Sequence, residues 1–210
     1  LRRAVAYAQG IYPVGAYAVE YITSVIQSQR GYDEVSVQIG YRRTPEQMQA
    51  LFADRQLVLA GLKHGTVGVV TDSGVVEITT FRTEGGYLDS RHPDWVKFVR
   101  DVREDLARRD FTVNAMAFSP RRGLCDPFGG QEDLQKGLLR AVGDPVLRFR
   151  EDALRILRGL RFAARFGFEI EENTRAAMHT EIAGLDTLAR ERVLTELEGF
   201  LLAATARDIL

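Results

Sequence analysis

Two charged residues near position 150 have the types and the spacing needed to recognise a nucleobase. We expect a helix to begin near Arg150, which would place Asp152 and Arg155 three residues apart and therefore side by side on one helix face. An ionised Asp only accepts hydrogen bonds, and an Arg only donates them. Cytosine and adenine present an amine donor beside a ring-nitrogen acceptor, whereas uracil and guanine present a carbonyl acceptor beside a ring N–H donor. This pair would therefore accept C and A and reject U and G.

The same pair has a simpler interpretation as an intrahelical salt bridge on a solvated face, which would contribute about 0.3–0.5 kcal/mol. That interpretation would be preferred for an isolated Asp-x-x-Arg pattern. Base recognition is favoured here because two further charged segments precede the pair, residues 108–117 (RRDFTVNAMA) and residues 126–130 (DPFGG). A wrong base would leave buried polar groups unpaired, at a cost of about 1–3 kcal/mol for each group.

Length and composition predict a folded protein with one large or two small domains. The 210 residues are 45% hydrophobic, which is enough to bury a core. The formal net charge of -1 gives no argument for nucleic-acid binding. Locally, arginines outnumber carboxylates between positions 140 and 165, which predicts either a positive stripe suited to phosphates or an ordinary solvated helix face. These arginines are Arg140, Arg148, Arg150, Arg155, Arg158, Arg161 and Arg165.

Cysteine and histidine usage argues against disulfide and zinc chemistry. The single cysteine, Cys125, excludes an intrachain disulfide and a cysteine-based zinc cluster. His64, His92 and His179 lack metal-ligand spacing, so we interpret them as surface or structural residues. The chain has no secretory segment and no apolar run long enough to cross a bilayer. We therefore expect a cytoplasmic protein without membrane contacts.

Hydrophobic periodicity predicts strands in the first part of the chain. Residues 33–39 alternate as in a half-buried strand, and Thr44 followed by Pro45 and Gln47 has the pattern of a helix start, with the helix reaching about Phe52. Residues 64–71 and 74–81 predict a β-hairpin around a turn that contains glycine, with Val75, Glu77, Thr79 and Phe81 on one face.

The second part is predicted to become helical. We expect a mobile loop at 83–94, a helix over 96–109, a strand over 111–118, and helices after the DPFGG turn. In the helix expected over 151–166, Ala153, Ile156, Leu157, Leu160 and Ala164 would form the apolar stripe. Phe162 and Phe166 would stack on a base or, as we prefer, fill the seam between domains. The domain boundary is expected near 141–145.

Seven segments occur in the order typical of class II tRNA nucleotidyltransferases, which the chain resembles from about Thr44 to its end. That family comprises CCA-adding enzymes, with close relatives that are CC-adding enzymes, A-adding enzymes and bacterial poly(A) polymerases. The segments are His64–Val70, Val76–Arg82, Asp89–Pro93, Arg108–Ala115, Asp126–Gly130, Val142–Pro145 and Arg148–Arg158.

The resemblance implies an α+β fold, with a head domain like that of DNA polymerase beta at residues 1–140 and an all-helical neck at residues 141–210. Family members continue into body and tail domains, which we expect to be absent from this chain. The implied partners are a tRNA 3′ end, CTP and ATP, and the implied cofactor is Mg²⁺. The oligomeric state is left open.

The resemblance also implies roles for individual residues. Asp152 and Arg155 would read the base, and Arg158 would help to position the phosphate or the base. Arg109, Asp110 and Asn114 would lie around the sugar and the triphosphate, with Arg109 and Asp110 counted among the catalytic residues. Glu77 would be the third carboxylate of the metal site.

Two family signatures near the N-terminus are not matched. Of the G-G-x-V-R-D turn that holds the triphosphate, only Gly15 remains, and Ser36 and Gln38 stand where the family has the two metal-binding aspartates. Magnesium prefers anionic oxygen ligands, whereas serine and glutamine are neutral. The sequence therefore predicts a nucleotidyltransferase that adds C, A or both to tRNA. A nucleotide- or RNA-binding relative without turnover and a poly(A) polymerase stay open as alternatives.

Overall fold

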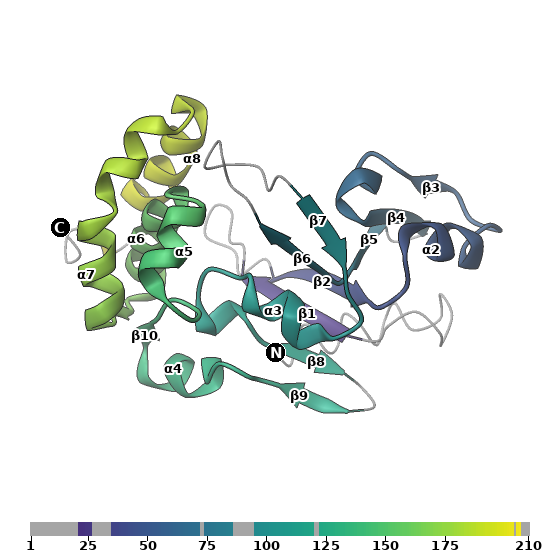
Figure 1. Ribbon diagram of the computed structural model, residues 1–210, viewed down its shortest axis with the longest axis horizontal. Helices are drawn as coiled ribbons and strands as arrows, with labels where there is room; N and C mark the ends of the chain where they lie inside the picture. Colours follow the sequence, from purple (N-terminus) through teal and green to yellow (C-terminus); the bar gives the residue numbers. More distant parts are fainter. Residues whose placement is uncertain are drawn as a thin grey trace. The chain divides into compact units, whose positions relative to one another are not determined.

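The computed structural model describes residues 21–26, 35–71, 74–85, 95–119, 122–203 and 205–206 (Figure 1). The contacts between residues in space divide the protein into two compact units. The first contains the residues up to Thr83 together with Val96–Arg108 and Met116–Asp126, and the second contains Glu84–Trp95, Arg109–Ala115 and Pro127–Leu210. The fold is α+β, as predicted.

A seven-stranded sheet organises the first unit, in the order β3-β4-β5-β2-β1-β8-β9. Only the β2–β5 pair is parallel among the strand pairs whose register is described for this sheet. The strands are β1 (Tyr21–Ile26), β2 (Val35–Tyr41), β3 (Leu57–Val58), β4 (Thr66–Thr71), β5 (Gly74–Thr80), β8 (Ala117–Ser119) and β9 (Gly123–Cys125). A separate two-stranded sheet consists of β6 (Arg82–Gly85) and β7 (Trp95–Phe98).

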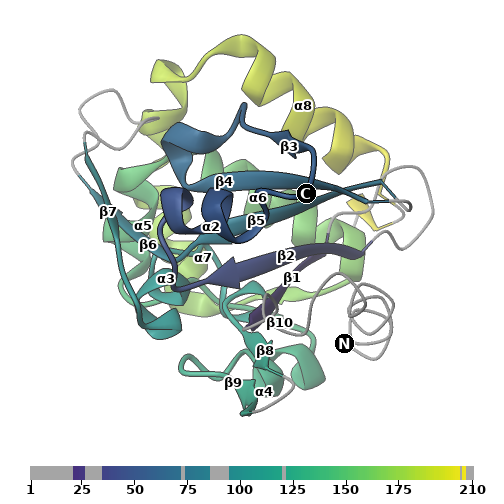
Figure 2. The same ribbon diagram turned by 90° about the vertical axis from the view of Figure 1, so that its right-hand side faces the viewer.

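Helix α2 (Pro45–Leu51) covers part of the seven-stranded sheet (Figure 2). The Thr44 side chain accepts from the Gln47 backbone, and the Gln47 side chain accepts from the Thr44 backbone, which forms the predicted capping box. Met48 and Phe52 then pack on alternate residues of β4 and β5, which are Val67, Val69, Val76 and Ile78. A short turn η2 (Leu62–His64) and helix α3 (Val102–Ala107) complete the unit.

Helices form most of the second unit, and α5, α6, α7 and α8 lie side by side in it (Figures 1 and 2). The helices are α4 (Gly130–Lys136), α5 (Pro145–Glu151), α6 (Leu154–Phe166), α7 (Glu172–Thr180) and α8 (Arg190–Leu201), with the 3-10 turns η3 (Thr112–Asn114) and η4 (Ile182–Thr187). Strands β10 (Leu138–Leu139) and β11 (Glu169–Ile170) pair in parallel. No helix in the described ranges is long and apolar enough to cross a membrane.

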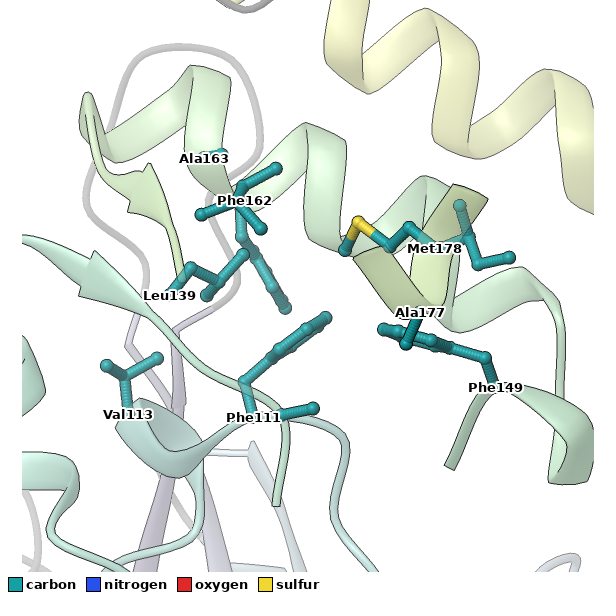
Figure 3. Close-up of a cluster of buried hydrophobic side chains, with 11 residues drawn as sticks. Phe111, Val113, Leu139, Phe149, Phe162, Ala163, Ala177 and Met178 are labelled. Atoms are coloured by element: carbon teal, nitrogen blue, oxygen red, sulfur yellow. The ribbon is translucent and has the colours of Figure 1, made fainter. Parts of the chain in front are cut away.

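The core of the second unit is centred on Phe111. Figure 3 shows its ring between Phe162 and the side chains of Phe149 and Met178. Phe111 and Phe162 meet edge to face at 6.0 Å between ring centroids, and Phe166 stacks on Phe162 at the same distance. Phe162 follows the predicted boundary at 141–145, whereas Phe111 precedes it. Phe162 therefore packs between these two parts of the chain, as predicted, and both residues belong to the second contact unit.

Several predicted elements are confirmed. Strand β2 and the β4–β5 hairpin form where the alternation indicated, and the apolar stripe of α6 is buried except at Leu160, which is partly exposed. Phe81 differs from its prediction, because the strand ends at Thr80 and the Phe81 side chain is buried rather than on the exposed face with Val75 and Glu77.

Other predictions are wrong. Residues 82–85 form β6 rather than part of a loop, and the remainder of that predicted loop lies outside the described residues. The helix predicted over 96–109 is β7 followed by the shorter α3. The strand predicted over 111–118 begins as the turn η3, because the Asn114 side chain accepts a hydrogen bond from the Phe111 backbone N–H at 3.3 Å.

Candidate functional site

The helix predicted to run through Asp152 is interrupted at that residue. Asp144 caps α5 by accepting from the backbone N–H groups of Val146 and Leu147, at 2.8 and 3.2 Å. Helix α5 ends at Glu151, and Asp152 is extended, with φ -151° and ψ 104°. Its Oδ1 accepts from the Leu154 backbone N–H at 3.0 Å. Asp152 therefore lies at the first turn of α6, where exposed N–H groups favour a carboxylate, and the prediction of one helix carrying both Asp152 and Arg155 is wrong.

Asp152 and Arg155 each have a partner from another part of the second unit. The second oxygen of Asp152, Oδ2, accepts from Arg192 Nη2 of α8 at 2.8 Å. Arg155 donates from Nη1 to Glu151 Oε2 at 2.6 Å and to the Arg148 carbonyl oxygen at 3.1 Å. The side chains of Asp152 and Arg155 are 17% and 10% exposed, so neither faces bulk water.

Asp110, Asn114 and Arg158 form a buried polar network. Asp110 Oδ2 accepts from Arg158 Nε at 2.6 Å, and Oδ1 accepts from Asn114 Nδ2 at 2.7 Å and from the Phe111 backbone N–H at 3.1 Å. Burial by itself would raise the pKa of Asp110. The charge of Arg158 and the hydrogen bonds from Asn114 and Arg158 outweigh burial and lower this pKa to about 2. Asp110 is therefore a fixed negative charge at neutral pH.

Backbone contacts hold this network against the helices. The Thr112 N–H donates to the Arg140 carbonyl at 2.9 Å, and the Val142 N–H donates to the Asp110 carbonyl at 3.0 Å. Arg109 donates from Nη1 to the Asn114 carbonyl oxygen at 3.3 Å. The structure thus brings Arg109, Asp110, Asn114 and Arg158 into one network. The same helix α6 that carries Arg158 also carries Arg155 and begins beside Asp152.

Helix α8 supplies two residues that the sequence prediction missed, Arg192 and Glu196. Arg192 binds Asp152, and Glu196 accepts from Arg161 Nε at 2.5 Å and lies 3.9 Å from Arg158 Nη1. Asp110 and then Glu196 and Asp152 contribute negative charge that raises the pKa of Arg158. A helix was predicted here, but the four-residue spacing of Arg192 and Glu196 usually indicates an exposed surface pair and gave no sign of these contacts.

Carboxylates pair with most of the arginines for which we predicted either a positive stripe suited to phosphates or a solvated helix face. Beyond Arg155 and Arg158, four arginines form ion pairs with carboxylates of the second unit. These pairs are Arg140 with Asp133, Arg148 with Glu151, Arg150 with Glu181, and Arg161 with Glu196. The arginines in this segment thus bind protein carboxylates in addition to any ligand.

The predicted metal site has one carboxylate. Glu77 is an exposed residue of β5 in the first unit, and β5 pairs in parallel with β2 from Ile39 opposite Ile78 onward. Ser36 and Gln38 occupy alternate positions of β2, and Gly15 lies outside the described residues. In the described part of the chain, no three His, Cys, Asp or Glu residues are grouped so that they could hold a metal ion. A neutral serine and glutamine beside one glutamate do not fit the magnesium site that the resemblance implies.

Comparison with known proteins settles the family. Residues 29–140 match the Poly A polymerase head domain, and residues 167–210 match a domain described as the probable RNA and SrmB-binding site of polymerase A. The chain belongs to the tRNA nucleotidyltransferase and poly(A) polymerase family. The head-domain match includes the β2 positions of Ser36 and Gln38.

CCA-adding enzymes are among the most similar curated relatives of this family member. One from Leuconostoc mesenteroides is 47% identical over 174 residues, which is 83% of this chain and 43% of that protein. Another from Limosilactobacillus fermentum is 46% identical over 164 residues, which is 78% of this chain and 40% of that protein. The chain therefore spans about two fifths of the length of these relatives.

Solved structures of CCA-adding enzymes share the fold. The Bacillus stearothermophilus CCA-adding enzyme in complex with CTP has a TM-score of 0.74 and 38% identity, over 84% of this chain and 42% of that chain. The Thermotoga maritima CCA-adding enzyme complexed with tRNA has a TM-score of 0.68 and 26% identity, over 90% of this chain and 44% of that one.

Proposed function

We propose that this chain is the nucleotide-selecting part of a tRNA nucleotidyltransferase of the CCA-adding type. In the proposed reaction, the 3′ hydroxyl of a tRNA attacks the α-phosphorus of CTP or ATP, and pyrophosphate leaves. The curated relatives and the CTP and tRNA complexes of similar enzymes support the choice of substrates. In this proposal residues 1–140 act as the head domain and residues 141–210 act as the neck.

One observation carries the proposal. Asp152 and Arg155 flank the start of α6, mostly buried, one to two turns before the Arg158 that binds Asp110. A carboxylate and a guanidinium at the head of a helix provide an acceptor and a set of donors within reach of one base. Although the predicted helix is interrupted at Asp152, this residue still lies near Arg155 in the sequence, at the first turn of α6.

The physical basis of selection is hydrogen-bond complementarity. The Asp152 carboxylate would accept from the amine of cytosine or adenine, and Arg155 would donate to the adjacent ring nitrogen. Uracil and guanine would place a carbonyl oxygen against the carboxylate and an N–H against the guanidinium, which leaves buried groups unpaired. Arg109, Asp110, Asn114 and Arg158 would hold the ribose and the phosphates through the network that links them.

A second candidate function is favoured by the metal-site residues. With Ser36 and Gln38 in place of two aspartates, the chain would select and bind a nucleotide or an RNA 3′ end without turnover. Base selection is common to both candidates because it depends on the second unit alone. Turnover distinguishes them.

Nucleotide binding tests the common part of the proposal. Dissociation constants for CTP, ATP, UTP and GTP should be measured by competition with a fluorescent nucleotide, for the native chain and for Asp152→Ala. We expect tighter binding of CTP and ATP, and loss of that preference in Asp152→Ala but not in the exposed control Asp186→Ala. Equal affinity of the native chain for all four nucleotides would refute the proposal. Incorporation of labelled CTP and ATP into tRNA lacking its 3′ end then separates the enzyme from the binding protein.

A further inference from the structure

We propose that Trp95 of β7 is a stacking platform for an unpaired nucleotide of RNA. Trp95 is the only tryptophan in the sequence, and it is 52% exposed. The inference rests on the proposed function for the class of partner, because the 3′ end of a tRNA is single-stranded. It adds a residue that lies outside the seven segments that carry the family resemblance.

Gly85 of β6 leaves room for the Trp95 ring. A Cβ atom at Gly85 would lie 2.6 Å from Cζ2 and 3.0 Å from Cε2 of this ring. These distances are shorter than a Cβ atom tolerates, so the ring lies against backbone that a side chain at position 85 would otherwise cover. The backbone thereby supports the ring, while about half of the residue remains exposed to solvent.

An exposed tryptophan is informative because this side chain gains much from burial. It is enriched at binding surfaces, where a partner covers the ring. Single-stranded nucleic acids use such rings as platforms, since every base has a flat face that can stack on an aromatic side chain. Proteins are the other class of partner that covers exposed tryptophan.

The charge around Trp95 favours a nucleic acid over a protein. Residues 91–103 contain four Lys or Arg residues and two Asp residues, in a chain whose formal net charge is -1. Lys97 is exposed and shares a face of β7 with Trp95, because side chains alternate along a strand. Asp101 serves as the cap of α3, where it accepts from the Arg103 backbone N–H at 2.9 Å. An aromatic ring with a cation beside it can bind a base and a phosphate of the same strand.

Tryptophan fluorescence observes this residue directly. Since the chain has one tryptophan, the emission of the native protein reports on position 95 alone. We expect a single-stranded oligoadenylate to quench this emission, because a stacked base lies against the ring. A duplex RNA of the same length should quench it much less, because its bases are already stacked within the helix.

Substitutions at position 95 separate stacking from packing. Trp95→Leu keeps an apolar side chain against Gly85, and Trp95→Phe keeps an aromatic one. Dissociation constants for a fluorescein-labelled oligoadenylate are measured by anisotropy, together with the Tm. We expect Trp95→Leu to weaken binding about tenfold, which corresponds to the loss of one stacked base, and Trp95→Phe to weaken it less than about threefold. The control Leu124→Ala, which shortens another exposed apolar residue, should not change binding.

The salt dependence of binding tests the part of Lys97. Each phosphate contact to a single strand contributes about 0.7 to the slope of log affinity against log salt concentration. We expect Lys97→Gln to reduce the steepness of that slope by about 0.7. Lys136→Gln, which replaces an exposed lysine of α4 paired with Glu132, is the charge-matched control and should leave the slope unchanged.

The outcomes separate this inference from the proposed function. Equal RNA affinity of the native chain, Trp95→Leu and Leu124→Ala would overturn the inference, even where CTP and ATP are still preferred over UTP and GTP. Emission that changes with protein concentration but not with RNA would also overturn it, because a second copy of the chain would then cover the ring. Quenching by RNA together with equal affinity for all four nucleotides would instead remove the proposed function.

Discussion

Arg158 of α6 and Asp110 meet at 2.6 Å between Nε and Oδ2, although 48 residues separate them in the sequence. Asp110 precedes the turn η3, and its second oxygen is bound by Asn114. This ion pair ties the candidate ribose and phosphate residues to the helix that begins beside the candidate base-reading pair. Together with the backbone hydrogen bonds of Thr112 and Val142, this contact fixes the distance between the two groups of residues.

Replacing Asp110 should test this contact directly. Asp110→Asn keeps the side-chain shape but removes the charge that Arg158 requires, so we expect a loss of about 2–3 kcal/mol in the free energy of unfolding at pH 7. Urea unfolding measures the loss. The exposed control Asp186→Asn should change stability by less than about 0.5 kcal/mol. Equal effects of the two substitutions would contradict a structural role for the ion pair.

The stability that Asp110 contributes should depend on pH. Its pKa is lowered from 3.8 to about 2 in the folded protein, so its contribution is complete above pH 4 and is lost as the pH falls from about 4 to about 2. The shift corresponds to roughly 2 kcal/mol. The difference in unfolding free energy between the native chain and Asp110→Asn should shrink by about two thirds of that amount between pH 7 and pH 2.5, because folded Asp110 is still mostly ionised at pH 2.5. A constant difference would show that the pKa is not lowered.

Substitution of Gly159 should destabilise the protein, although this glycine lies in the middle of α6. Replacing a helical glycine with alanine usually stabilises by about 1 kcal/mol. Here an added Cβ would lie 2.4 Å from Met178 Cε and 3.0 Å from the Phe111 ring, in the core of the second unit. We expect Gly159→Ala to lower stability by roughly 1–3 kcal/mol.

A double substitution checks the reason for that loss. Met178→Ala should relieve part of the clash, so the double variant should lose less than the sum of the two single losses in urea unfolding. Strict additivity would argue that close packing at Gly159 is not the cause.

The side chains at positions 36 and 38 of β2 should determine whether the protein binds a divalent metal ion. With Ser36 and Gln38 as found, chelation by EDTA should change the CTP dissociation constant by less than about twofold, because neutral ligands hold magnesium poorly. Installing both carboxylates by Ser36→Asp with Gln38→Asp should add Mn²⁺ binding that is visible by electron paramagnetic resonance. The neutral pair Ser36→Asn with Gln38→Asn serves as the matched control. Tight Mn²⁺ binding by the native chain would contradict the assignment of these positions.

Local signals predicted a good part of the fold. The capping box of Thr44 and Gln47 and the alternation on both sides of the turn before Gly74 each determine an element within a few residues, and both are confirmed. The family resemblance rested on several short segments in order, and it too is confirmed. In these cases the information lies within the segment itself.

Contacts between distant residues explain what the sequence did not reveal. No proline or glycine marks the interruption at Asp152, which is instead accompanied by a backbone hydrogen bond from Leu154 and an ion pair with Arg192. Residues 96–98 have helical spacing but join a strand pair with β6. Several carboxylates that pair with the arginines between 140 and 165 are also distant in the sequence, such as Asp110 for Arg158, Glu181 for Arg150 and Glu196 for Arg161.

A crystal structure of this chain with CTP would show whether Asp152 and Arg155 read the base, as we propose. We expect the cytosine amine within about 3.2 Å of an Asp152 carboxylate oxygen and the ring nitrogen within the same distance of an Arg155 nitrogen. A cytosine bound elsewhere, with Asp152 and Arg155 in their present contacts and no hydrogen bond to the base, would contradict it.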